Sequence, residues 1–167
     1  MGLEPDTSER HAVIIATNVE VIESLVTSAG YGVVGAAETA VNGELLLKHH
    51  VLQGRAPEVA VVENDLKGPT GWDSISDLRA ASPTTQVLLV VNEDWTPRDL
   101  GSSGAFAVVT RSRLGELVTE LDGVDKWIAD QAVSKIDDDR RTGRDRRIHL
   151  DWTQVGWERR ADQRRAA

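Results

Sequence analysis

Two oppositely charged residues follow apolar runs of this sequence and could form a site together. Glu63 comes directly after the run 57–62, and Arg111 comes just after the run 105–109. A guanidinium can hold a carboxylate in a bidentate, charge-assisted pair. The alternative is a solvated salt bridge at a polar strand end, which contributes little.

Other residues that could do chemistry lack the spacing that the chemistry needs. His49 and His50 are neighbours on an expected helix and point about 100° apart, so they form no chelating face. Three serines have no histidine and aspartate at a hydrolase spacing: Ser24, Ser74 and Ser76. The chain has no cysteine, no GxGxxG and no P-loop. We therefore expect no enzyme, no cofactor and no bound metal.

The elements that must position these residues alternate regularly along the chain. The expected strands are five apolar runs rich in β-branched residues: 11–16, 31–36, 57–62, 86–91 and 105–109. They are nearly all apolar, as expected when helices cover both faces of a parallel sheet. The pattern predicts a doubly wound, five-stranded parallel α/β fold with a site at the carboxyl ends of its strands.

The helical patterns between these strands differ in strength. The helix over 40–53 is expected to carry an apolar stripe: Val41, Leu45, Leu46 and Leu52. A fourth helix starting at Thr96 is weak, because a glycine and two serines follow within a few residues. A long amphipathic helix is expected from Leu114 to Ile128.

The net charge of −8 conceals an asymmetry. Residues 134–167 hold ten Lys/Arg and seven Asp/Glu, a net charge of +3, so the rest of the chain carries −11. The acidic body argues against nonspecific DNA binding. We expect a flexible N-terminus over 1–10, a domain over 11–133 and an arginine-rich tail over 134–167, disordered or partly docked. With no signal segment and no membrane span in view, we expect a cytoplasmic protein.

With this order of elements, residues 11–130 resemble the CheY-like receiver domains of bacterial response regulators. The best local match is PEVAVVENDLKGPTG over 57–71, where Glu63 takes the place of the phospho-accepting aspartate and Gly71 that of a glycine eight residues later. GAFAVVTR over 104–111 is similar to the family's fifth strand and the lysine after it. The resemblance implies a flavodoxin/CheY-like (βα)5 fold.

The residues that carry the family's phosphorylation chemistry are replaced. The family uses two acids after the first strand to hold Mg²⁺, an acceptor aspartate, a hydroxyl residue after the fourth strand, an aromatic switch residue and a lysine. The matching positions are Ala16, Thr17, Glu63, Val91, Val108 and Arg111. The metal site, which needs several oxygen ligands, is thereby lost. The resemblance implies a receiver-like domain that is no longer phosphorylated on aspartate.

Glu63 opposite Arg111 then has two interpretations. Glutamate can mimic a phosphoaspartate held by a guanidinium. We favour a locked scaffold, because Val91 and Val108 leave no switch for a mimic to operate. A receiver phosphorylated on a non-standard acid is a further alternative, with Asp65 as the substitute acceptor.

Five tryptophans stand against one tyrosine and one phenylalanine. Trp72 and Trp95 follow the third and fourth strands and are expected at the rim of the altered site, and Trp127 lies late in the last helix. Exposed tryptophans there could anchor a partner protein, although packing on their own domain is an equal alternative.

These patterns predict a non-catalytic, phosphorylation-independent interaction module of bacterial signal transduction, related to two-component systems. The partner is expected to be another signalling or regulatory protein. The alternative is a nucleic-acid or nucleotide binder that acts through the arginine- and tryptophan-containing tail.

Overall fold

The apolar runs form one five-stranded parallel sheet in the computed structural model, which describes residues 10–95 and 104–136. The strands are β1 (Arg10–Ile15), β2 (Tyr31–Ala37), β3 (Val59–Glu63), β4 (Gln86–Val91) and β5 (Ala107–Thr110). The helices are α1 (Val19–Ser28), α2 (Ala40–Leu52), α3 (Gly71–Ala81), the short 3₁₀ helix η1 (Arg111–Arg113) and a C-terminal helix over 116–136. The expected helix starting at Thr96 lies outside the described residues.

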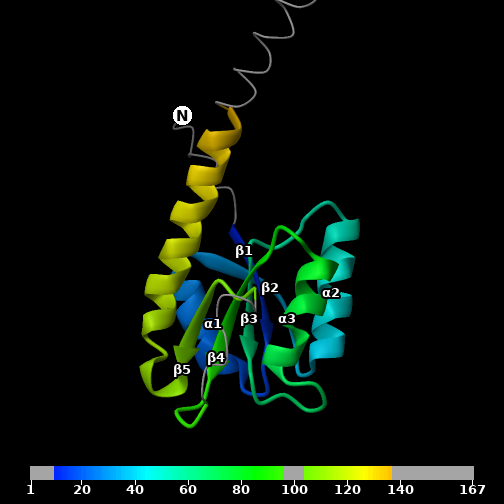
Figure 1. Cartoon of the computed structure of the whole chain (residues 1–167), viewed down its shortest axis with the longest axis vertical. Helices are drawn as coiled ribbons and strands as arrows, with labels where there is room; N and C mark the ends of the chain where they lie inside the picture. The colour runs from blue at the N-terminus through cyan, green and yellow to red at the C-terminus, as the bar shows by residue number, and fades with distance from the viewer. Residues whose placement is uncertain (1–9, 96–103, 137–167) are drawn as a thin grey trace, which may run out of the picture. The chain divides into compact units, whose positions relative to one another are not determined.

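The strand order in the sheet is β2-β1-β3-β4-β5, and every neighbouring pair is parallel. The order reverses at β1, so the switch point lies beside the carboxyl ends of β1 and β3. This order confirms the predicted doubly wound α/β fold. All five strands end at the lower edge of the sheet in Figure 1.

Side-chain alternation divides the core between the two faces of the sheet. One cluster joins residues of α2 and α3 to every second residue of three strands: Val13, Ile15, Ala60, Val62, Val87, Leu89 and Val91. Figure 1 shows α2 and α3 on one side of the sheet and α1 on the other. Intervening residues such as Ile14, Val61 and Leu88 are fully buried as well. The strands are therefore covered on both faces, which explains why they contain so few polar residues.

The chain divides into two compact units, Met1–Val124 and Asp125–Ala167. Within the first unit, the start of the C-terminal helix buries Leu117, Leu121 and Val124 completely. The described part of the second unit is helical over 125–136. The domain boundary expected after residue 133 stays a prediction, because the tail from 137 lies outside the described residues. Among the helices described, none is long and apolar enough to cross a membrane.

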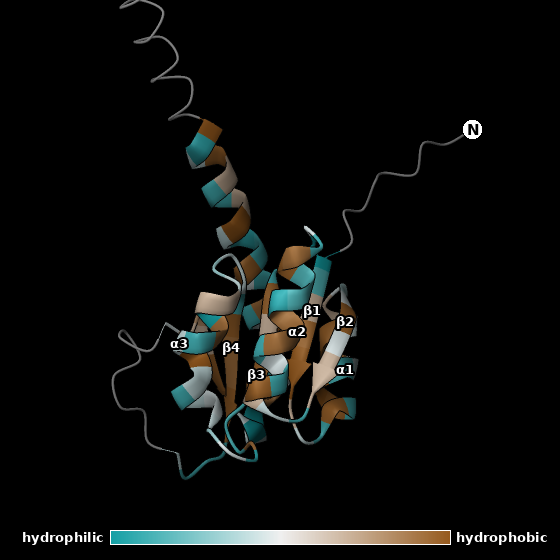
Figure 2. Ribbon diagram, turned by 90° about the vertical axis from the view of Figure 1, so that its right-hand side faces the viewer, coloured by the Kyte–Doolittle hydropathy of each residue, from teal (hydrophilic) through white to brown (hydrophobic). Residues whose placement is uncertain are grey.

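The structure corrects the expected buried face of α2. Three of the four residues of the predicted stripe are exposed: Val41, Leu45 and Leu52. The buried residues of this helix are Ala40, Gly43 and Leu47. A Cβ at Gly43 would lie 2.2 Å from Cδ1 of Ile15, so α2 approaches β1 closely through its smallest residues. Hydrophobic segments of α2 are consequently seen from outside in Figure 2.

His50 lies on α2 with an unsatisfied ring nitrogen. Within the described ranges, its buried Nε2 has no hydrogen-bond partner. Burial lowers the pKa of His50, and the nearby His49 and His11 lower it further, while a hydrogen bond to the Val34 backbone acts against them. The folded state therefore favours a neutral imidazole at this position.

We expect His50 to make stability depend on pH. Its pKa is lower in the folded chain than its ordinary value of 6.5, so its contribution is present above that pH and is lost as the pH falls toward the lowered value. Urea unfolding at several pH values measures this slope, which His50→Gln should reduce. The matched control is His49→Gln on the same helix. Equal slopes for the parent chain and His50→Gln would show that His50 does not titrate on unfolding.

Candidate functional site

Three strands bring the predicted site residues together at the carboxyl edge of the sheet. Glu63 is the last residue of β3, Thr17 follows the end of β1 by two residues, and Arg111 directly follows β5. Because β5 is separated from β3 by β4, the arginine reaches across one strand to meet the carboxylate. The sequence-based expectation that Glu63 and Arg111 face each other agrees with this arrangement.

Both carboxylate oxygens of Glu63 are engaged. Oε2 accepts hydrogen bonds from the Thr17 amide at 2.9 Å and from the Thr17 hydroxyl at 2.8 Å. Oε1 forms an ion pair with Nη2 of Arg111. The Glu63 side chain is 2% exposed and that of Arg111 is 48% exposed. A buried charge needs such partners, and these contacts tie the ends of β1, β3 and β5 together.

A hollow of about 290 Å³ lies beside this pair. Its lining residues are Asn18, Val21, Ile22, Glu63, Val90, Arg111 and Leu114. Glu63 is the only carboxylate among the described residues that line it. Within the described residues, no three potential ligands are grouped so that they could hold a metal ion. The arrangement holds one half-buried ion pair beside the apolar side chains of Val21, Ile22, Val90 and Leu114.

The structure does not bring Val91 to this hollow. Val91 belongs to the core cluster on the face of α2 and α3, whereas its neighbour Val90 lines the hollow and pairs in register with Glu63. Val90 has no hydrogen-bonding group to offer an anion either. The period-two alternation of β4 was the signal that could have identified it. Ala16 is fully buried, and its amide donates to the Ala37 carbonyl at 2.9 Å.

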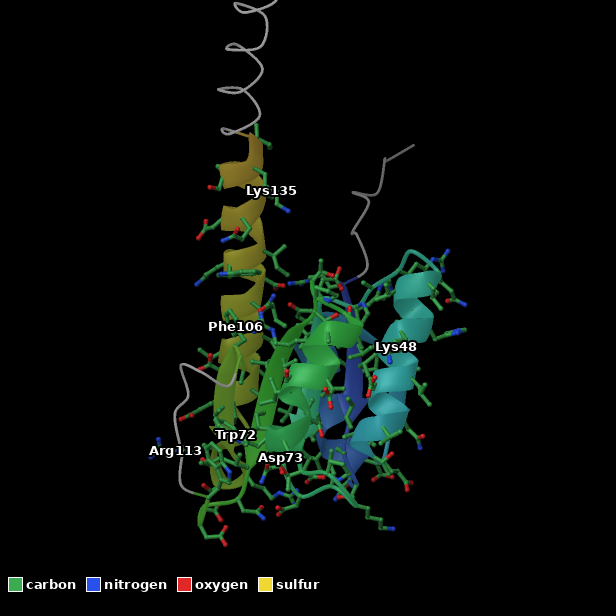
Figure 3. All side chains as sticks on the ribbon, turned by 45° about the vertical axis from the view of Figure 1, so that its right-hand side comes forward. Lys48, Trp72, Asp73, Phe106, Arg113 and Lys135 are labelled. Carbon is green, nitrogen blue, oxygen red and sulfur yellow. The ribbon has the colours of Figure 1, made fainter. Side chains whose placement is uncertain are left out.

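A second hollow, of about 510 Å³, opens at the same edge of the sheet. The loop after β3, the start of α3 and the loop after β4 line it with Asn64, Asp65, Thr70, Trp72, Asp73, Asn92, Asp94 and Trp95. The rings of Trp72 and Trp95 contact each other with centroids 5.2 Å apart and planes tilted by 57°. Trp72 and Asp73 lie together at the lower end of α3 in Figure 3.

Hydrogen bonds fix the loops around this second hollow. The Asn64 side-chain oxygen accepts from the Trp72 amide at 3.1 Å, and the Trp95 amide donates to the Asn92 carbonyl at 3.1 Å. The Asn92 side-chain amide contacts the carboxylate of Asp65. Asp65 is therefore part of the second hollow and lies apart from the pair that Glu63 makes.

The three tryptophans proposed as partner anchors have different surroundings. Trp72 and Trp95 are partly buried and pack against the core cluster, while still lining the second hollow. Trp127 lies in the second unit and is 42% exposed. The polar residues around the tryptophan pair were not predicted from the sequence, because they come from separate segments that share no sequence motif. The proposed nucleic-acid binding by the tail falls outside the described residues.

Comparison with known proteins places this geometry in a class. No protein-family model matches the sequence, and no curated protein matches it. Among solved structures, the receiver domain of the putative response regulator NarL from Mycobacterium tuberculosis is 20% identical, with a TM-score of 0.52 over 70% of this chain and 97% of that one. The response regulator domain of Thermotoga maritima CheB is 15% identical, with a TM-score of 0.55 over 70% and 95%.

A third similar structure is a chain of the CheX–CheY–BeF3–Mg complex from Borrelia burgdorferi. It is 12% identical, with a TM-score of 0.58 over 69% of this chain and 88% of that one. The protein therefore has the fold of a response-regulator receiver domain, which confirms the resemblance seen in the sequence.

Proposed function

We propose that this chain is a phosphorylation-independent, receiver-like protein-interaction module of a bacterial signalling pathway, and that it is not an enzyme. The state of Glu63 carries the proposal. A phospho-acceptor attacks the donor through a free carboxylate oxygen, and both oxygens of Glu63 are already engaged by Thr17 and Arg111.

The surroundings of Glu63 support the same proposal. Phosphoryl transfer needs a metal ion to orient the donor and to neutralise charge. The positions that would supply two metal-binding acids are Ala16 and Thr17, and the Thr17 hydroxyl donates to Glu63. The valine that lines the adjoining hollow, Val90, gives no hydrogen bond to an anion.

The ion pair itself favours a locked scaffold over a phosphoaspartate mimic. Glu63 is held from two sides, by Thr17 on the β1 side and by Arg111 after β5. A switch needs two arrangements whose populations an input can shift. Every described contact of Glu63 stabilises one arrangement.

Partner binding is then the remaining way for this domain to signal. Its structural neighbours are receiver domains of response regulators, and one of them was solved in a CheX–CheY complex. We place the contact surface of the first unit at the hollow lined by Trp72 and Trp95, because tryptophans dominate many interfaces. Trp127 is a separate candidate anchor on the second unit.

We expect the intact mass of the full chain to stay unchanged after incubation with acetyl phosphate and Mg²⁺. The reason is that Glu63 has no free oxygen and the metal-binding acids are replaced. A conventional receiver domain treated in parallel is the positive control. A hydroxylamine-labile gain of one phosphoryl group at Glu63 or Asp65 would contradict the proposal.

A further inference from the structure

The hollow that contains the tryptophan pair has a composition of its own. Its volume, about 510 Å³, falls within the roughly 300–1,000 Å³ typical of ligand pockets. Two partly buried indoles contribute its aromatic surface, and three carboxylates line it: Asp65, Asp73 and Asp94. The described lining residues include no lysine or arginine, so this described part of the lining carries a negative charge.

The contacts of these groups keep the carboxylates spread over the hollow. Asp65 is held by the Asn92 side chain after β4, and Asp73 accepts a hydrogen bond from the Thr70 hydroxyl at 2.8 Å. No three acids of the described chain converge as metal ligands do. Separated acids suit an extended cation with several donors better than they suit a small hard ion.

A guanidinium matches both kinds of surface. Its planar face stacks on an indole through a cation–π contact, and its edge presents a fork of donors to carboxylates. A lysine ammonium is a compact, strongly hydrated charge without that planar face. The planes of the two indole rings are tilted by 57° to each other, and both tryptophans line the hollow together with the three acids.

We infer that the hollow formed by the loop after β3, the start of α3 and residues 92–95 after β4 binds an arginine side chain of a partner protein. The inference rests on the proposed partner-binding function and specifies the chemistry that its surface recognises. Figure 3 shows Trp72 and Asp73 side by side on the helix that contributes to this hollow.

The test is a titration of the full chain with the peptide acetyl-Gly-Arg-Gly-amide, followed by the indole N–H signals of the five tryptophans in NMR spectra. The signals of Trp72 and Trp95, assigned with Trp→Phe variants, should shift saturably. For one side chain we expect a Kd on the order of a millimolar. The same peptide with neutral citrulline should bind at least about fivefold more weakly, since a cation–π contact alone is worth about that factor. The lysine peptide should also bind more weakly, because its ammonium lacks the planar fork of donors that pairs with carboxylates.

A matched pair of variants locates the site. Asp94→Asn should weaken binding of the arginine peptide about fivefold, because it removes one charge from the lining. Asp77→Asn removes the same charge from an exposed position of α3 outside the hollow and should change nothing. Trp95→Phe keeps an aromatic ring in the core and should weaken binding of the arginine peptide less than Asp94→Asn does.

Several outcomes would overturn the inference. They are an absence of saturable shifts at Trp72 and Trp95, equal binding of the citrulline or lysine peptide, equal loss from Asp77→Asn, and displacement of the peptide by millimolar Mg²⁺. The result is separable from the phosphorylation test. A chain that accepts a phosphoryl group yet binds the arginine peptide contradicts the proposed function alone, and an unphosphorylated chain that ignores the peptide contradicts this inference alone.

Discussion

Gly71→Ala should lower the free energy of unfolding by roughly 2–3 kcal/mol, the upper range for inserting an atom into a packed site. An ideal Cβ at Gly71 would lie 2.5 Å from the carbonyl oxygen of Glu63 and 3.0 Å from Cα of Asn64. Both are backbone atoms, and the Gly71 amide donates to the Asn64 carbonyl at 3.0 Å. Neither α3 nor the end of β3 can therefore move aside freely.

Urea unfolding followed by circular dichroism measures this change. Gly115→Ala is the control, since a Cβ there meets no atom within 4 Å. Gly115→Ala should leave the stability unchanged or raise it slightly, because alanine lowers the conformational entropy of the unfolded chain. An equal loss from both substitutions would mean that the close approach of α3 to β3 is not its cause. The same close approach accounts for the glycine eight residues after Glu63, which contributed to the receiver resemblance.

Arg111→Met should also destabilise the chain, by roughly 2–3 kcal/mol, which is less than for a fully buried pair because the arginine is half exposed. The substitution leaves the Glu63 carboxylate buried with Thr17 as its described partner. Glu63→Gln should cost less, about 1 kcal/mol, since its side-chain oxygen still accepts from Thr17 while the half-exposed Arg111 can turn to solvent.

A double-mutant cycle in urea separates these contributions. The double variant should be more stable than Arg111→Met alone, because Glu63→Gln removes the buried negative charge that Arg111→Met leaves without its ion-pair partner. The control is Arg113→Met, two residues further along η1, whose ion pair with Glu116 is exposed and contributes little. If Arg111→Met and Arg113→Met behave alike, the Glu63 pair is a solvated surface bridge.

Much of the fold could be predicted from the sequence because the strands are buried on both faces. A strand such as β4, with the sequence QVLLVV, is apolar on both faces and is therefore recognised as a buried strand. The same holds for most residues of β1 and β3. Their alternation with helices leaves few topologies besides a doubly wound sheet. The pairing of Glu63 with Arg111 followed, since parallel strands end at one edge.

The buried face of α2 depended on tertiary structure. Its leucines and valines form a stripe at helical spacing. The face that packs on the sheet is instead the one whose small residues let the backbone of α2 approach β1 closely. Gly43 against Ile15 sets that approach and leaves Val41 and Leu45 exposed. A count of apolar positions along the helix carries no information about this distance.

The hollow beside Glu63 and the hollow beside the tryptophan pair were likewise predicted only in part from the sequence. The sequence by itself determined that Glu63 and Arg111 lie at the carboxyl ends of two strands, and the carboxyl ends of parallel strands meet at one edge of the sheet. Only the tertiary structure decided that Thr17 closes the other side of Glu63, that Val90 and not Val91 lines the adjoining hollow, and that Trp72 and Trp95 share a hollow with three aspartates. These relations depend on loop conformation and on side-chain direction, which are fixed by packing between segments far apart in the chain.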